Sequence, residues 1–238
     1  MDRPLATAPP RYGRVPPGVQ PPEDPAYRST LLRHPLKPLV EIPQTLSEIT
    51  GPSHPYEAVG PLITDLTRQH AAAPIGERII VEGRVLDERG RPVPRTLVEV
   101  WQANACGRYA HEVDNHDAPL DPNFTGNGRT ITDEEGRYRF VTIKPGHYPW
   151  GNHYNAWRPA HIHFSVLGPG FLTRLVTQMY FPGDPLFPLD PIFNSVKDPA
   201  VRERMVSSFD ITLTVPDWAL GFRWDIVLRG REATPMLA

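Results

Sequence analysis

Cysteine is almost absent from this sequence. Its 238 residues include one cysteine, Cys106, so no disulfide can form within the chain. A single thiol also excludes the cysteine-rich type of structural zinc site, which needs several thiolates. Because small secreted domains commonly depend on disulfides, the shortage favours a protein of a reducing compartment.

Long apolar runs and a strong net charge are lacking as well. No apolar run reaches the length of about 18 residues that a membrane-spanning helix needs. The first ten residues contain no apolar segment of signal-peptide length. The formal net charge is −2, whereas a nucleic-acid-binding face needs an excess of lysine and arginine. We therefore expect a cytoplasmic protein that binds neither nucleic acid nor a membrane.

Proline, in contrast, is abundant and unevenly distributed. There are 30 prolines, about 13% of the chain against about 5% in average proteins, and this density disfavours a helical bundle. Thirteen of them lie in the first 55 residues, where such a composition favours extended backbone rather than a packed core. We expect residues 1–60 to form an extended proline-rich arm and residues 61–238 to form the folded domain.

The residues after the arm have the two-residue periodicity of β-strands. Short alternating segments are separated by turn signals, a pattern typical of a two-sheet β-sandwich. One short helix is expected from Asp198, a good cap residue, followed by Pro199. Two long polar loops, 107–129 and 145–159, interrupt the strands and are candidates for function. The expected strands are 79–87, 96–102, 130–133, 137–143, 160–167, 172–181, 211–215 and 222–229.

His161 and His163 are the most informative pair of residues. In a strand, side chains two residues apart share a face, so both imidazoles should point one way while Ile162 and Phe164 point into the core. Two explanations remain open from this pattern. The histidines either form hydrogen bonds within the core, or they bind a metal ion, for which imidazole is the commonest ligand.

Two tyrosines offer further metal ligands. Tyr109 and Tyr148 each follow a predicted strand and lie at the start of a long loop, where functional residues concentrate. A lone tyrosine is more commonly a packed ring with its hydroxyl at the surface. Phenolate is nevertheless a hard anionic donor that suits trivalent iron. Sequence spacing alone does not single out these two tyrosines.

The run from Trp157 to Phe164 resembles the signature of the intradiol ring-cleaving dioxygenases. Further stretches match that family in the same order along nearly the whole chain: 42–44, 74–81, 97–105, 118–124, 142–146 and 223–230. The resemblance implies a prealbumin-like β-sandwich with one non-haem Fe(III) per chain. It is strongest to the iron-bearing β type of subunit, which implies an iron-free α partner of similar fold and a higher-order α–β oligomer.

The resemblance also assigns roles to individual residues. The implied iron ligands are Tyr109, Tyr148, His161 and His163, and Tyr148 is further implied to leave the metal and accept a proton. Arg158 and Gln178 are implied to lie beside the substrate ring. The implied substrate contacts are Trp150 and Ile192 in the pocket wall and Tyr27 near an acidic group of the substrate.

The implied reaction is the cleavage of protocatechuate by O2 to 3-carboxy-cis,cis-muconate, a step in aromatic degradation. A related dioxygenase acting on another catechol, such as 4-sulfocatechol, is the nearest alternative. A non-enzymatic ligand-binding sandwich with structural histidines is a third, but it leaves the spacing between Tyr148 and His163 unexplained. Asp190 departs from the family pattern, which leaves the polarity of the pocket open.

Overall fold

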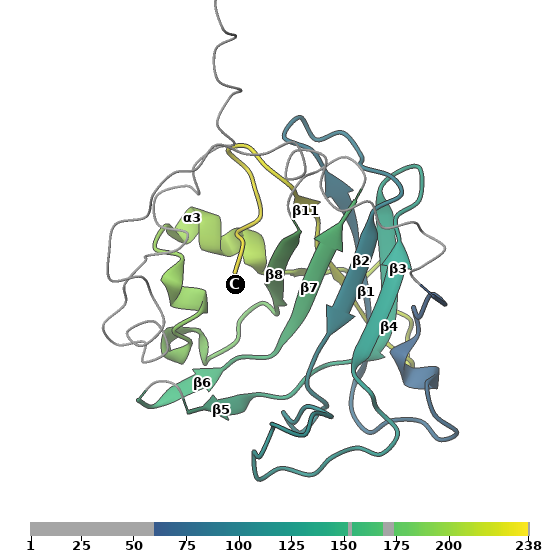
Figure 1. Ribbon diagram of the computed structural model, residues 1–238, viewed down its shortest axis with the longest axis vertical. Coiled ribbons are helices and arrows are strands. Elements are labelled where there is room, and N and C mark those ends of the chain that lie inside the picture. Colours follow the sequence, from purple (N-terminus) through teal and green to yellow (C-terminus); the bar gives the residue numbers. More distant parts are fainter. Residues whose placement is uncertain (1–59, 152–153, 169–173, 238) are drawn as a thin grey trace, which may run out of the picture.

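The computed structural model describes residues 60–151, 154–168 and 174–237. The predicted arm, including Tyr27, lies outside these residues apart from Gly60, so the division at residue 60 stays a prediction. Two β-sheets form the described part of the chain (Figure 1), with helical turns beside β8. This arrangement confirms the predicted all-β sandwich. None of the described helices is long and apolar enough to cross a bilayer.

The first sheet is built around β1 (Arg78–Leu86). On one side β1 pairs antiparallel with β4 (Arg137–Ile143). On its other side it pairs in parallel with β10 (Leu220–Arg223) and then with β11 (Ile226–Val227). A short edge strand, β9 (Ser208–Phe209), completes the sheet against β10. The central strand is thus paired with strands from both the middle and the late part of the chain.

The second sheet has the order β3–β2–β7–β8, and all its pairs are antiparallel. Its strands are β3 (Asn127–Ile131), β2 (Leu97–Trp101), β7 (His161–Leu167) and β8 (Leu175–Tyr180). A separate hairpin joins β5 (Tyr148–Trp150) to β6 (Ala156–Arg158). The sequence did not predict this hairpin, and β3 begins three residues before the strand predicted at 130–133.

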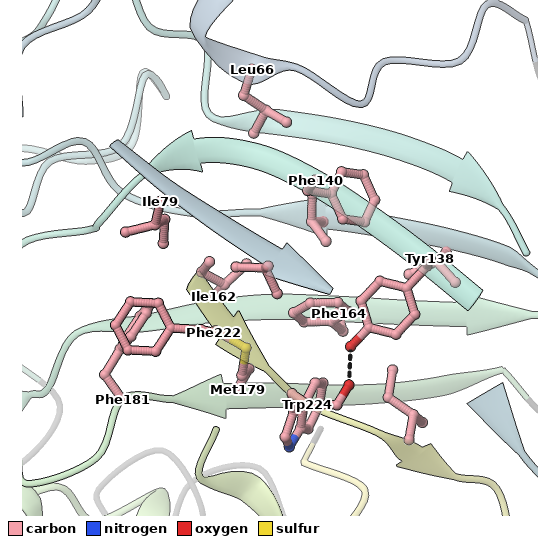
Figure 2. Packing of buried hydrophobic residues seen from close by; sticks show 14 of the residues in the cluster. Leu66, Ile79, Tyr138, Phe140, Ile162, Phe164, Met179, Phe181, Phe222 and Trp224 are labelled. Atoms are coloured by element: carbon pink, nitrogen blue, oxygen red, sulfur yellow. Dashed lines mark hydrogen bonds between the residues drawn. The ribbon is translucent and has the colours of Figure 1, made fainter. Parts of the chain in front are cut away.

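The core fills the space between the two sheets (Figure 2). Phe164 of β7 is fully buried and lies edge-on to Trp224, with 4.9 Å between the ring centroids. Tyr138 of β4 donates a hydrogen bond of 2.5 Å from its hydroxyl to the Trp224 carbonyl, which satisfies two buried polar groups. Each large side chain buried here contributes roughly 1.5–3 kcal/mol, so the core holds β7 firmly in place.

A helical segment follows β8. The predicted helix is confirmed as α3 (Pro199–Arg202), where the Asp198 carboxylate accepts a hydrogen bond from the Ala200 amide. It continues as a 3-10 turn instead of a longer α-helix. Aromatic and aliphatic side chains of this segment pack with Tyr180 in a second hydrophobic cluster. The 3-10 turns are η2 (Leu66–Arg68), η3 (Phe187–Leu189), η4 (Phe193–Ser195) and η5 (Glu203–Met205).

The prediction of a strand at 211–215 is wrong. This segment forms turns, because the Asp210 carboxylate accepts hydrogen bonds from the amide and hydroxyl of Thr212 at 2.8 and 2.6 Å. The Asp210 carbonyl also accepts from the Leu213 amide at 3.2 Å. An aspartate side chain that bonds the backbone two residues ahead is typical of a turn. The alternation of apolar and polar residues from Ile211 to Val215 therefore does not mark a β-strand.

Candidate metal centre

The two histidines of β7 share the face opposite the core, as predicted. Their ring centroids lie 4.9 Å apart. The Nδ1 of His161 is 2.6 Å from the Pro159 carbonyl oxygen, which only accepts hydrogen bonds, so Nδ1 carries the hydrogen and Nε2 presents its lone pair. His163 stacks on Trp101, with 4.8 Å between centroids and an interplanar angle of 6°. Both rings are thereby fixed in orientation.

Tyr109 reaches the histidines from the loop after β2. Its backbone amide donates a hydrogen bond of 2.8 Å to the Asp114 carboxylate. The Asn104 side chain organises the start of the same loop, since its carbonyl oxygen accepts from the amides of Cys106 and Arg108. These contacts direct the Tyr109 hydroxyl to a position 3.1 Å from the Nε2 of His163.

Tyr148 arrives from the other side, at the beginning of β5. Its loop packs directly on the Tyr109 loop, and the Gly146 amide donates to the Asn104 carbonyl at 2.9 Å. The contact is close enough that a Cβ atom at Gly107 would lie 2.0 Å from the His147 carbonyl oxygen. The two tyrosine rings meet edge-on at 5.6 Å. Two loops far apart in sequence are therefore held as one unit.

Four donor atoms converge at this point. The Tyr148 hydroxyl lies 3.2 Å from the Nε2 of His161, as the Tyr109 hydroxyl lies close to His163. Burial raises the pKa of both phenols. Burial, followed by the nearby Arg158 charge, lowers the pKa of His161 well below its usual range and that of His163 to about 3. The imidazoles are therefore neutral and available as ligands.

These donors suit a trivalent iron ion. The set consists of two phenol oxygens, each within about 3.2 Å of an imidazole nitrogen, and the two imidazoles themselves. A buried phenol resists losing its proton unless a cation lies beside it. Two phenolates are hard anionic donors that match a small, highly charged ion.

The Arg158 guanidinium lies beside the four donors. Its carbon atom is 6.0 Å from the centre of the Tyr148 ring and 5.8 Å from the Trp150 ring. Arg158 closes the β5–β6 hairpin directly opposite Tyr148, and its Nη2 donates to the Gln178 side-chain oxygen. The structure thus brings Arg158, Gln178 and Trp150 to the centre predicted for them.

Other predicted residues are less closely associated. Ile192 is the cap residue before η4 and packs against the second hydrophobic cluster, while Tyr27 lies outside the described residues. Sequence reasoning missed the stacking of Trp101 on His163. It also missed that Asp190, singled out only as unusual, is buried against Arg158. Sequence spacing predicts neither contact, because the two residues of each pair lie far apart in the chain.

Comparisons with known proteins identify the family of this chain. A family model described as Dioxygenase matches residues 49–230. The chain is 56% identical to the protocatechuate 3,4-dioxygenase beta chain of Burkholderia cepacia, over 99% of both chains. The chain belongs to the intradiol dioxygenase family. Intradiol dioxygenases are ring-cleaving oxidoreductases that use non-haem iron, so the chain is an enzyme of this class.

Further relatives support the same family. A model of the protocatechuate 3,4-dioxygenase beta subunit N terminus matches residues 13–45. A hydroxyquinol 1,2-dioxygenase from Rhizobium is 36% identical over 56% of this chain and 45% of its own length. The structure of 3-chlorocatechol 1,2-dioxygenase from Rhodococcus opacus superposes with a TM-score of 0.53 at 25% identity, covering 68% of this chain and 63% of the other. The chain thus shares its fold with an intradiol dioxygenase that is 25% identical to it.

Proposed function

We propose that the chain cleaves protocatechuate with O2 between its two hydroxylated carbons to give 3-carboxy-cis,cis-muconate. Both oxygen atoms of O2 enter the product and one carbon–carbon bond breaks, so no external reductant is consumed. The observation that carries the proposal is the convergence of two phenol oxygens and two imidazole nitrogens. The substrate is inferred from the name of the Burkholderia relative, which is 56% identical.

In this proposal Tyr109, Tyr148, His161 and His163 hold one Fe(III) per chain. Ferric iron bound there would act as a Lewis acid that favours the deprotonated catecholate form of the substrate, whose ring is electron-rich enough to react with O2. The Tyr148 oxygen receives a proton from a substrate hydroxyl. The permanent charge of Arg158 stabilises negative charge that develops on the substrate.

The first test is the colour and turnover of the iron-loaded protein. We expect a visible tyrosinate-to-iron absorption band and oxygen uptake with protocatechuate. Tyr148→Phe should lower kcat by about 100-fold, the usual scale for removing a proton-transfer group, and shift the visible band. The matched control is Tyr154→Phe, an exposed tyrosine of the same hairpin, which should leave both unchanged.

Two results would contradict the proposal. A colourless protein with full iron content would exclude tyrosine ligation, and an unaltered kcat in Tyr148→Phe would remove this residue from the mechanism. Parallel assays with 4-sulfocatechol decide the substrate. A higher kcat/KM for 4-sulfocatechol than for protocatechuate would replace the proposed substrate by the sulfonated one.

We further propose that the chain assembles with an iron-free α chain of similar fold. Two observations support this: the relative is named a beta chain, and several large apolar side chains are exposed around β9 and the following turns. We expect co-expression with an α chain to give a stable heteromer, detected by size-exclusion chromatography, with higher kcat than the isolated chain. Equal activity of the isolated chain would contradict this role. The exposed side chains are Phe209, Ile211, Val215 and Trp218.

A further inference from the structure

Asp190 is a carboxylate completely enclosed in the protein. Its side chain is 0% exposed, and it forms an ion pair with Arg158, which is 3% exposed, at 3.1 Å between Oδ1 and Nε. Removing a carboxylate from water costs several kcal/mol unless its charge is compensated. Asp190 contacts Arg158, which lies over the ring of Tyr148, one of the four donors. The cost of burying this carboxylate therefore suggests a role for it at the site.

The protein fixes this carboxylate from several sides. Oδ1 also accepts a hydrogen bond of 2.9 Å from the Ile192 amide, and Oδ2 lies 3.1 Å from the Tyr180 hydroxyl. The backbone is held as well, because the Asn194 side-chain amide donates to the Asp190 carbonyl at 2.8 Å. Asp190 is thus a rigid anchor rather than a mobile counter-ion.

Asp190 also interacts with Arg158 indirectly, through the Tyr180 hydroxyl. The Nη2 of Arg158 donates to the Tyr180 hydroxyl oxygen at 3.2 Å and also to the side-chain oxygen of Gln178. The Tyr180 hydroxyl also lies 2.9 Å from this Gln178 oxygen. A hydroxyl has one hydrogen, and the charged carboxylate of Asp190 is a stronger acceptor for it than the neutral Gln178 amide. Tyr180 therefore accepts from Arg158 and donates to Asp190. Asp190 thus contacts the guanidinium directly at Nε and, through the Tyr180 hydroxyl, at Nη2.

We propose that Asp190, together with Tyr180, is a positioning residue that holds the Arg158 guanidinium against Tyr148 and Trp150 and balances its charge. This rests on the proposed function, because Arg158 acts on a bound catechol there. Without Asp190, Arg158 would add a positive charge to the pocket and attract anions, but its N–H groups would have no fixed direction. With Asp190 the pair is neutral, and the direction of the guanidinium is set by contacts from β8 and from the turn that follows η3.

The test is Asp190→Asn in the iron-loaded enzyme, co-expressed with its α chain. Asparagine keeps the shape and removes the charge. We expect kcat to fall by about 10- to 100-fold, since a misplacement of about 1 Å at a catalytic group costs up to about 100-fold. The dissociation constant for protocatechuate, titrated without oxygen by the change in visible absorption, should stay within twofold or become tighter because the pocket gains a positive charge. Iron content should be unchanged.

The matched control is Asp87→Asn. Asp87 also pairs through a carboxylate oxygen with an arginine Nε, that of Arg91 at 2.7 Å, but in the turn that follows β1 and outside the metal centre. Its kcat and dissociation constant should equal those of the unmodified enzyme. A kcat within twofold of the unmodified enzyme in Asp190→Asn overturns the proposal. A loss of iron in Asp190→Asn also overturns the proposal. So does a dissociation constant that rises by the same factor by which kcat falls, since either result indicates a purely structural role.

Tyr180→Phe keeps the proposal testable if Asp190→Asn does not fold. It removes one neutral hydroxyl from a buried ring and should lower kcat by about 3- to 10-fold, the scale of a single hydrogen bond, with the dissociation constant unchanged. An unaltered kcat in Tyr180→Phe overturns the proposal. Failure of the unmodified enzyme to turn over protocatechuate would instead refute the proposed function, so the two failures are distinguishable.

Discussion

Replacing His161 with alanine is expected to remove iron and ring cleavage together. The imidazole is 1% exposed. Its Nδ1 donates to the Pro159 carbonyl, so Nε2 is the nitrogen that faces the Tyr148 hydroxyl. Loss of a group that only supports a ligand costs roughly 10- to 100-fold in metal affinity or activity, and loss of a ligand costs more. We expect kcat/KM to fall by more than about 100-fold.

The measurement is iron content by plasma emission together with oxygen uptake. The control is His70→Ala, which removes an exposed histidine whose Nε2 lies 2.8 Å from the Thr125 hydroxyl, and it should keep full iron and activity. His161→Ala is expected to fold, because Ile162 and Phe164 on the opposite face of β7 still fill the core. Circular dichroism checks this. An iron-loaded, active His161→Ala enzyme would exclude this histidine from the centre.

Replacing Gly107 with alanine is expected to disrupt the centre without touching any of its four donors. A Cβ atom there would lie 2.0 Å from the His147 carbonyl oxygen, and the backbone has a φ of +79°. The loops that carry Tyr109 and Tyr148 would have to separate. Overpacking of this kind costs about 1–3 kcal/mol, and the positive φ adds about 1–2 kcal/mol. We expect both iron binding and activity to be lost.

Gly90→Ala separates these two contributions. Gly90 has a similar φ of +73°, but nothing lies within 4 Å of an added Cβ, so its replacement carries only the backbone strain. Denaturant unfolding should show a smaller loss in the free energy of unfolding for Gly90→Ala than for Gly107→Ala, and Gly90→Ala should keep its iron. Equal losses in the two variants, or full iron content in Gly107→Ala, would contradict the role assigned to the contact between the loops.

Periodicity predicted the parts of the centre that lie on one strand. The alternation from His161 to Val166 placed both imidazoles on one face and the aliphatic and aromatic residues on the other, as the structure has them. This works because the side-chain direction in a strand depends only on local backbone geometry. The same rule failed at 211–215, where the Asp210 side chain stabilises a turn that alternation does not reveal.

The remaining parts depend on contacts between distant segments. Tyr109 and Tyr148 approach each other because Gly107 and Gly146 allow their loops to touch, and only a resemblance to known dioxygenases identified them from the sequence. Asp190 reaches Arg158 across 32 positions of the chain. Such contacts are determined by how the sheets and loops pack in three dimensions, and short-range patterns carry no information about them.

The pairing of β1 constrains the order in which the protein is completed during synthesis. Its residues Ile79–Glu82 align with Leu220–Arg223, and Val85 and Leu86 align with Ile226 and Val227, about 140 positions later. Until those residues leave the ribosome, one edge of β1 has no partner, and an unpaired edge is prone to pair with other chains. Contacts of such long range also slow folding. The sheet built around β1, which packs across the core from the sheet that carries His161 and His163, is therefore completed only after residues about 140 positions later have been made.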